Sequence, residues 1–307
     1  MGRVTQRRRV TTIRADGSIT DGATGSVPRT ASRLDQIAVE EPLELRLGGE
    51  SFTVTMRTPG HDFELAAGFL VAEGIIGSRE DLRGLRYCAG TDERGNQTYN
   101  VIDAELDAPV PETVRLRSRN VLTSSACGIC GTTSIDAVEK TLARRPAAQL
   151  RLKVETLLDL PDLMRTEQQI FRKTGGVHAA ALFTASGALL CLREDVGRHN
   201  AVDKVVGWAL TQDRLPLSGT VLQVSGRASF ELVQKAALAG IEMLAAVGAP
   251  SSLAVDLAER SGVSLAGFSR GGSINLYAHP ERVDTGEAGR DAQAARGRHQ
   301  GHESAAS

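Results

Sequence analysis

Short apolar runs alternate with helical patterns along the second half of the chain, and this alternation constrains the fold more than any other feature. From Ala201 onward, apolar residues recur at i, i+3, i+4, i+7 and i+8, the spacing of one buried helix face. Strands that alternate with helices of about 10–15 residues are typical of βαβ units, in which helices cover both faces of one sheet. The sequence therefore predicts an α/β fold. The predicted elements are strands over 177–184, 188–192, 220–224, 243–247 and 263–268, and helices that begin at 201 or span 230–239 and 252–260.

The region before this pattern predicts a smaller α+β portion. Apolar and polar residues alternate over 43–47 and again over 52–56, on either side of Gly48-Gly49, which predicts a β-hairpin with one buried face. Asp62 is a suitable N-cap for a helix that ends near Gly74. Later in the chain, a strand over 150–154 precedes a helix that we expect to open at Asp159-Leu160-Pro161 and to end at Gly175-Gly176.

Both ends of the chain are polar and lack an apolar period, so we expect them to be poorly ordered. Arg7-Arg8-Arg9 is not followed by an apolar stretch, and we interpret it as part of a solvated basic tail rather than an export signal. We divide the chain into an N-terminal tail over 1–38, an α+β portion over 39–119, an α/β domain over 120–283 and a C-terminal tail over 284–307.

Charge and composition argue against several classes of function. The chain has 36 Lys and Arg against 37 Asp and Glu, and aromatic residues make up 4% of it, so it has neither a general basic field nor many stacking platforms for nucleic acid. Four cysteines in 307 residues do not form a disulfide scaffold, which favours a reducing compartment. No run of 18 apolar residues predicts a membrane span. We therefore expect a cytoplasmic protein that binds neither nucleic acid nor a membrane.

Two of the cysteines, Cys127 and Cys130, form a C-x-x-C pair in a loop of small residues that leaves the sulfur atoms accessible. Asp136 and Glu139 have capping-box spacing, so the pair would precede a helix N-terminus, where the helix dipole lowers a thiol pKa. Such a pair is compatible with half of a zinc site, a redox dithiol or a sulfur carrier. Because the sequence has no second pair, we predict reactive thiol chemistry and no bound metal.

Several glycine-rich or charged segments follow predicted strands, where ligand sites of α/β sheets form. Gly267–Ser273 combines two glycines, an arginine and two serines that can wrap a phosphate, with an aromatic ring that can stack on a base. Glu194–Lys204 places Arg198 and His199 where an anion would bind, and we slightly favour this reading over a capped, solvated helix start. Ser225–Ser229 and Ala249–Ser252 fit backbone anion binding or ordinary helix capping equally well.

Taken in order, these segments resemble the formate dehydrogenase accessory sulfurtransferase (FdhD) family, from about Glu41 to Pro280. The resemblance is carried by Thr58-Pro-Gly-His-Asp62, Gly68-Phe-Leu70, Glu73-Gly-Ile-Ile76, Ser125-Ala-Cys-Gly-Ile-Cys-Gly131, Thr174-Gly-Gly-Val-His178, Glu194-Asp-Val-Gly-Arg-His-Asn-Ala-Val-Asp-Lys204, Ser225-Gly-Arg-Ala-Ser-Phe-Glu231, Ala249-Pro-Ser-Ser252 and Gly267-Phe268.

The resemblance implies a cytidine-deaminase-like layered α/β fold and a homodimer. It implies that Cys127 receives persulfide sulfur from a cysteine desulfurase and passes it to molybdenum bis(molybdopterin guanine dinucleotide), or its tungsten form, before that cofactor enters formate dehydrogenase. We give Cys130 a supporting role, since two cysteines at this spacing can close a disulfide. The cofactor-binding segment implied by the resemblance consists of Phe268, Ser269, Arg270, Gly271, Gly272 and Ser273.

Two alternatives belong to other classes. A zinc-dependent deaminase needs H-x-E upstream of P-C-x-x-C, whereas here Ala126 precedes Cys127 and the only upstream histidine, His61, is followed by Asp62 and Phe63. A non-catalytic chaperone would hold the cofactor without transferring sulfur, and the sequence leaves this alternative open.

Overall fold

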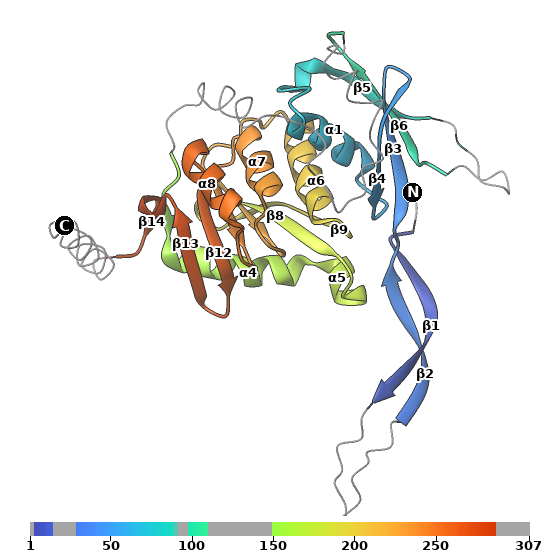
Figure 1. Cartoon of the computed structure of the whole chain (residues 1–307), viewed down its shortest axis with the longest axis horizontal. Coiled ribbons are helices and arrows are strands. Elements are labelled where there is room, and N and C mark those ends of the chain that lie inside the picture. Colours follow the sequence, from blue (N-terminus) through green and yellow to red (C-terminus); the bar gives the residue numbers. More distant parts are fainter. Residues whose placement is uncertain (1–2, 15–28, 89, 91–97, 110–148, 287–307) are drawn as a thin grey trace, which may run out of the picture.

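The computed structural model describes residues 3–14, 29–88, 90, 98–109 and 149–286 (Figure 1). Its largest sheet has six strands in the order β13-β12-β11-β10-β8-β9. The central strands β10, β11 and β12 run parallel, while β8, β9 and β13 run antiparallel to their neighbours. The strands are β8 (His178–Thr184), β9 (Leu189–Asp195), β10 (Thr220–Val224), β11 (Met243–Ala246), β12 (Ser264–Arg270) and β13 (Ser273–Ala278).

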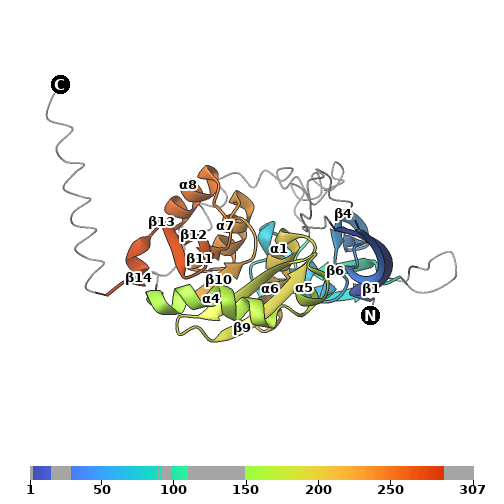
Figure 2. The same ribbon diagram turned by 90° about the horizontal axis from the view of Figure 1, so that it is seen from below.

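Helices cover both faces of this sheet. One core joins alternate strand residues such as Leu182 and Leu244 to helices α6, α7 and α8. The other joins Phe183 and Met243 to α4, and Figure 2 shows α4 on the side of the sheet opposite α7 and α8. The α/β prediction is confirmed, whereas the finer cytidine-deaminase-like label stays a prediction. The helices are α4 (Val154–Glu167), α5 (Gln169–Thr174), α6 (Arg198–Thr211), α7 (Phe230–Leu238) and α8 (Ser252–Ser261).

Helix α4 begins earlier than predicted. It starts at Val154, directly after the short strand β7 (Leu152–Lys153), so that Pro161 lies inside the helix rather than in its first turn. The fully buried Leu157 and Leu160 lie on the core face of this longer helix, and their burial against the sheet extends it toward the N-terminus. Strand β7 pairs with β14 (Val283–Asp284), which follows the short 3-10 helix η2 (Pro280–Arg282).

The N-terminal portion forms a four-stranded sheet in the order β4-β3-β6-β5, and the predicted hairpin is present as its first two strands. Its elements are β3 (Glu41–Leu47), β4 (Glu50–Arg57), α1 (Asp62–Ala72), the 3-10 helix η1 (Arg79–Asp81), β5 (Leu82–Tyr87) and β6 (Val101–Leu106). Helix α1 packs on α6 through two glycines. A side chain at Gly68 would overlap the Asp203 carbonyl group, and one at Gly207 would overlap that of Glu64, so only glycine permits this approach.

The expectation of a poorly ordered tail over 1–38 is wrong for the residues that the structure describes there. Strands β1 (Thr5–Arg14) and β2 (Arg29–Ala38) pair antiparallel and form a ribbon that extends away from the body (Figure 1). Its base is held by a hydrogen bond from the Val39 amide to the Val4 carbonyl (3.0 Å) and by packing of α5 on β2. The ribbon carries no apolar stripe, which is why the sequence pattern does not reveal it. None of the helices in the described ranges has the length and apolar composition needed to span a bilayer.

Candidate functional site

A pocket of about 400 Å³ opens where the parallel strands end. Ser225 follows β10, Val247 follows β11, and Ser269 and Arg270 close β12, so the pocket lies at the carboxyl edge of the sheet, where α/β proteins bind ligands. The start of β8 supplies His178. The opposite wall comes from α4 and α5, with Asp162, Arg165, Gln168 and Phe171.

Part of the predicted cofactor-binding segment lines this pocket, namely Ser269, Arg270 and Gly271. Phe268 is 37% exposed and has a left-handed backbone (φ 54°), with the Arg270 guanidinium 5.9 Å from its ring centroid. Gly271 and Gly272 also have positive φ and form the turn into β13, which begins with Ser273. Ser269 is buried and its hydroxyl donates to the Gln223 side chain (3.4 Å), so within this segment Arg270 supplies the charge.

A second group of polar side chains lies beside the pocket, around Gly226. His178 and Arg198 flank this glycine, and burial followed by the charge of Arg198 lowers the pKa of His178. The Nε atom of Arg198 is buried and has no hydrogen-bond partner among the described residues. The positive charge of Arg198 lies beside His178, which lines the pocket, and together with Arg270 and Arg165 it makes this end of the sheet suited to an anion.

His199 belongs to the same cluster. Its Nε2 lies 3.4 Å from the hydroxyl of Ser229, at the start of α7, and 3.4 Å from a carboxylate oxygen of Glu231. The hydrogen bond with His199 is the main reason that the pKa of Glu231 falls to about 2. The carboxylate is therefore ionised at any physiological pH and fixes the imidazole at the N-terminus of α7.

Part of the segment Glu194–Lys204 forms a structural joint, while Arg198 of the same segment lies beside the pocket, so anion binding there stays a prediction. Asp195 and Lys204 form a buried ion pair (2.7 Å), and both also bond the backbone of Thr58 (3.0 and 2.9 Å). Asn200 donates to the Met56 carbonyl (2.7 Å) and to Asp195 (3.0 Å). These bonds tie the end of β4 to the start of α6, so they connect the two sheets.

Two buried acidic side chains fix loops around the sheet. Glu194 accepts hydrogen bonds from the Ile170 and Phe171 amides (2.7 and 2.8 Å), which holds the start of α5 beside the pocket. Nothing in the sequence accounts for Glu242, but in the structure its carboxylate accepts from the amides of Gln149, Leu150 and Gly219. It therefore anchors the segment that leads into β7.

The two serine loops differ in what their side chains bind. Ser251 accepts a hydrogen bond from the Ala254 amide (3.3 Å) and caps α8, as the helix-capping reading predicts. Ser225 accepts from the Ala179 amide (2.9 Å) and thereby ties its loop to β8, although it also borders the pocket. The helical wall with Arg165 and Gln168 was missed by sequence reasoning, because nothing in its pattern separates a pocket wall from a solvated helix.

Cys127 and Cys130 lie outside the described residues, so their predicted chemistry stays a prediction. Of the other two cysteines, Cys191 is buried, and burial raises the pKa of its thiol to about 12, which makes it unreactive. Cys88 is half-buried. Within the described ranges, no group of three or more His, Cys, Asp or Glu side chains is arranged to hold a metal ion.

Comparisons with known proteins agree with one another. The model of the FdhD/NarQ family matches residues 38–284. The chain is 54% identical over 289 residues to the sulfur carrier protein FdhD of Nocardia farcinica, which covers 94% of this chain and 98% of that protein. It is 50% identical over 288 residues to the protein of that name from Mycobacterium tuberculosis, covering 92% and 100%. A crystal structure described as a formate dehydrogenase accessory protein, from Desulfotalea psychrophila, matches with a TM-score of 0.67 and 25% identity over 92% of this chain and 100% of that one.

Proposed function

Because the chain belongs to the FdhD/NarQ family, we propose that it is a sulfur carrier that serves the maturation of formate dehydrogenase. In this proposal Cys127 accepts persulfide sulfur from a cysteine desulfurase and transfers it to molybdenum bis(molybdopterin guanine dinucleotide). The cofactor is the substrate here, and it enters formate dehydrogenase afterwards. A homodimer and a cytoplasmic location complete the proposal. The relatives named above as sulfur carrier proteins support the general activity.

The observation that carries the finer proposal is the pocket at the strand ends. Its volume of about 400 Å³ falls within the usual range for small-molecule sites, and the Arg270–Gly271 turn offers a charge and open backbone to a phosphate. The exposed ring of Phe268 adds a surface on which a guanine base can stack. These features suit a large ligand that carries both phosphates and a base.

The sulfur step itself needs no oxidant. The Cys127 thiolate attacks the terminal sulfur of the donor's persulfide, the sulfur–sulfur bond of the donor breaks, and the donor leaves as a thiolate. Cys127 then carries a persulfide with one additional sulfur atom. Transfer of that atom breaks the sulfur–sulfur bond of the persulfide, and its electron pair stays on Cys127, which returns to the thiolate form. The sulfur atom leaves as sulfane sulfur, so the accepting cofactor supplies the two electrons that bring it to the sulfide level and is itself oxidised.

Mass spectrometry tests this step directly. After incubation with a cysteine desulfurase and cysteine, we expect the Cys127 peptide to gain one sulfur atom that a reductant removes. The Cys191 peptide is the internal control, because its buried thiol of raised pKa should stay unmodified. Additional sulfur only on Cys130 would reverse the two roles. Additional sulfur on neither residue would favour the alternative of a chaperone that holds the cofactor without transferring sulfur.

The pocket is tested by Arg270→Ala. We expect this change to weaken binding of a guanine nucleotide by about 1.5–3 kcal/mol, the range for a lost charge-assisted hydrogen bond. Isothermal calorimetry measures the effect. Arg83→Ala is the matched control, because Arg83 is an exposed arginine on β5 that pairs with Glu105 and Asp107 and does not line the pocket. Equal affinities of the Arg270 variant and the unmodified protein would contradict the assignment and direct attention to Arg165.

A further inference from the structure

Apart from the packing of α5 on β2 at its base, the β1–β2 ribbon projects from the body, and no third described strand pairs with it. Ten residue pairs join the two strands, from Thr5↔Ala38 to Arg14↔Arg29, and each strand has one edge that no other described strand covers. A two-stranded ribbon alone is marginally stable in water, and free edges of this length are usually covered in native proteins. The ribbon therefore gains stability from docking on another surface.

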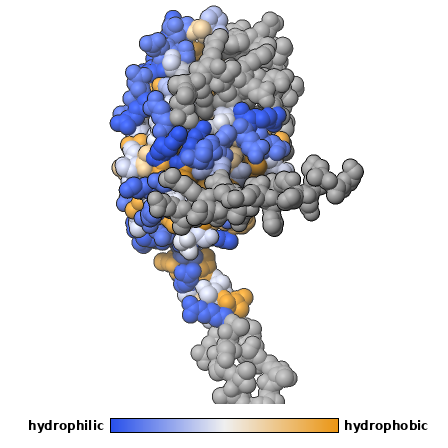
Figure 3. Space-filling model, turned by 90° about the vertical axis from the view of Figure 1, so that its left-hand side faces the viewer, coloured by the Kyte–Doolittle hydropathy of each residue, from blue (hydrophilic) through white to orange (hydrophobic). Residues whose placement is uncertain are grey.

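One face of the ribbon combines positive charge with exposed apolar side chains. Residues directly opposite in register share a face, so Arg7, Arg9 and Ile13 lie with Leu34. Ile13 is 68% and Leu34 64% exposed, and neither arginine forms an ion pair with a residue in the described ranges. Figure 3 shows hydrophilic and hydrophobic residues side by side on the projecting ribbon. This face fits a surface that is acidic and partly apolar.

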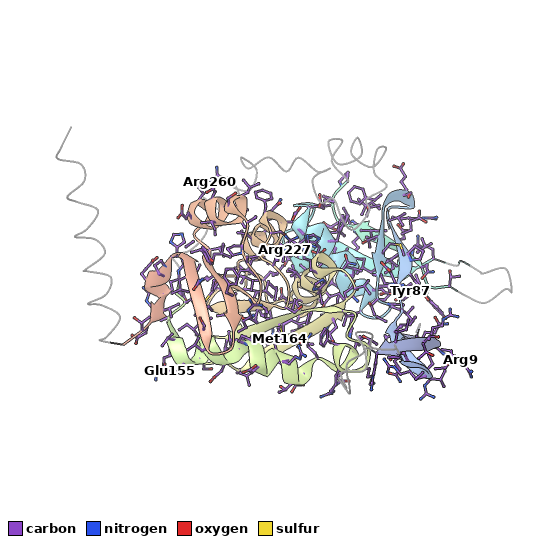
Figure 4. The ribbon with its side chains drawn as sticks, turned by 60° about the horizontal axis from the view of Figure 1, so that its bottom comes forward. Arg9, Tyr87, Glu155, Met164, Arg227 and Arg260 are labelled. Carbon is purple, nitrogen blue, oxygen red and sulfur yellow. The ribbon has the colours of Figure 1, made fainter. Side chains whose placement is uncertain are left out.

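The outer face of α4 is such a surface. Glu155 and Asp159 are exposed and follow one another at i and i+4, opposite the residues that α4 buries in the core, and neither lines the pocket. Leu163 lies beside them and is 43% exposed. Neither carboxylate forms an ion pair with any residue that the structure describes. In Figure 4, Glu155 and Arg9 lie at opposite ends of the molecule, so the ribbon cannot reach the α4 of its own chain.

We propose that the β1–β2 ribbon docks on the outer face of α4 in a second copy of this chain. Positions two residues apart on a strand lie about 6.8 Å apart, and positions four residues apart on a helix lie about 6 Å apart along its axis. The spacing of Arg7 and Arg9 on the ribbon therefore matches the spacing of Glu155 and Asp159 on α4. Leu34 and Ile13 then meet Leu163. A two-fold axis forms this contact twice. The inference rests on the homodimer proposed above and assigns the surfaces that form it.

A protein surface fits the ribbon better than nucleic acid does. The two strands have six arginines and one aspartate but no aromatic residue on which a base could stack. The whole chain has a formal net charge of −1, so the residues outside the ribbon are net acidic. Exposed leucine and isoleucine beside the arginines match the composition of protein interfaces, which are enriched in arginine and apolar groups at their centres.

Charge reversal in the full-length chain tests the proposal, with the dimer dissociation constant measured by sedimentation. The double variants Arg7→Glu/Arg9→Glu and Glu155→Arg/Asp159→Arg should each weaken the dimer by roughly tenfold or more, because like charges then face each other. The variant that combines all four changes should restore it. Arg8→Glu, on the other face of the ribbon, is the matched control and should have little effect. Circular dichroism checks that each variant is folded.

Several outcomes would overturn the inference. A chain that is monomeric at all concentrations has no such contact. A dimer that resists both double variants uses another surface, in which case the homodimer of the proposed function survives and this contact does not. If the double variants weaken the dimer and the variant with all four changes does not restore it, the ribbon does not dock on α4. Binding of a duplex DNA oligonucleotide that requires Arg7 and Arg9 would make the ribbon a nucleic-acid arm. Sulfur loading of Cys127, measured on the same variants, reports on the proposed function separately.

Discussion

Cys127→Ala should abolish the maturation of formate dehydrogenase while the protein still folds and binds a guanine nucleotide. The sulfur atom to be transferred must be held on a thiolate, and under the proposed function Cys127 is the residue that receives it. Replacement by alanine removes the sulfur atom that receives the persulfide sulfur in this proposal, and it is a small change beside Ala126 and Gly128. Cys130→Ala should reduce maturation less, since we give this residue a supporting role.

The measurement is formate dehydrogenase activity in cells whose own copy of the gene is replaced by each variant. Cys88→Ala is the matched control, because it removes a half-buried thiol that the proposal does not use. Melting temperatures and nucleotide affinities of the purified variants separate a loss of chemistry from a loss of folding. Normal maturation by the Cys127 variant would exclude the persulfide mechanism at this residue.

Lys204→Met should lower the free energy of unfolding by about 3–5 kcal/mol, the usual cost of leaving one partner of a buried ion pair alone. The side chains of Lys204 and Asp195 are 1% and 0% exposed, so water cannot replace the lost ammonium group. The change also removes the hydrogen bond to the Thr58 carbonyl. Both effects act at the joint between the two sheets.

Urea denaturation measures this loss, with Lys173→Met in α5 as an exposed-lysine control that should have little effect. The double variant Asp195→Asn/Lys204→Met should recover part of the stability, because it no longer buries an unpaired charge. A loss below about 1 kcal/mol for Lys204→Met would place the pair in the range of weak surface ion pairs and contradict this assignment.

The sequence predicted the elements whose burial is visible in the local pattern of apolar residues. Strands β8 and β10–β12 were predicted from short apolar runs, and helix α6 from the spacing of its apolar residues, since burial imposes these patterns on any chain. The ribbon was missed because its strands bury no common face, and their pairing joins residues that are far apart in the sequence, such as Thr5 and Ala38. The start of α4 was misplaced because a proline usually marks the first helical turn, whereas here burial of Leu157 and Leu160 extends the helix beyond it.

In the candidate site, too, the sequence predicted the residues that follow a local pattern and not the contacts between distant parts of the chain. Sequence reasoning singled out the Arg270–Gly271 turn because a glycine pair and an arginine after a strand have a known use, and these two residues do line the pocket. For Glu194–Lys204 the sequence could not separate the residues that bind another part of the chain, Asp195 and Lys204, from Arg198, which lies beside the pocket. Thr58, whose amide donates to Asp195, lies 137 residues earlier in the chain, so no local sequence pattern reveals this contact.

The contact between Gly68 and Gly207 has a consequence for how the molecule unfolds. At these glycines the two helix backbones touch, and one core cluster joins residues of both sheets with α1 and α6. Separating the N-terminal sheet from the larger one would expose apolar residues of each, so we expect the two parts to unfold together. Hydrogen exchange checks this, because the amide hydrogens of α1 and α6 should then exchange with solvent through a shared opening event.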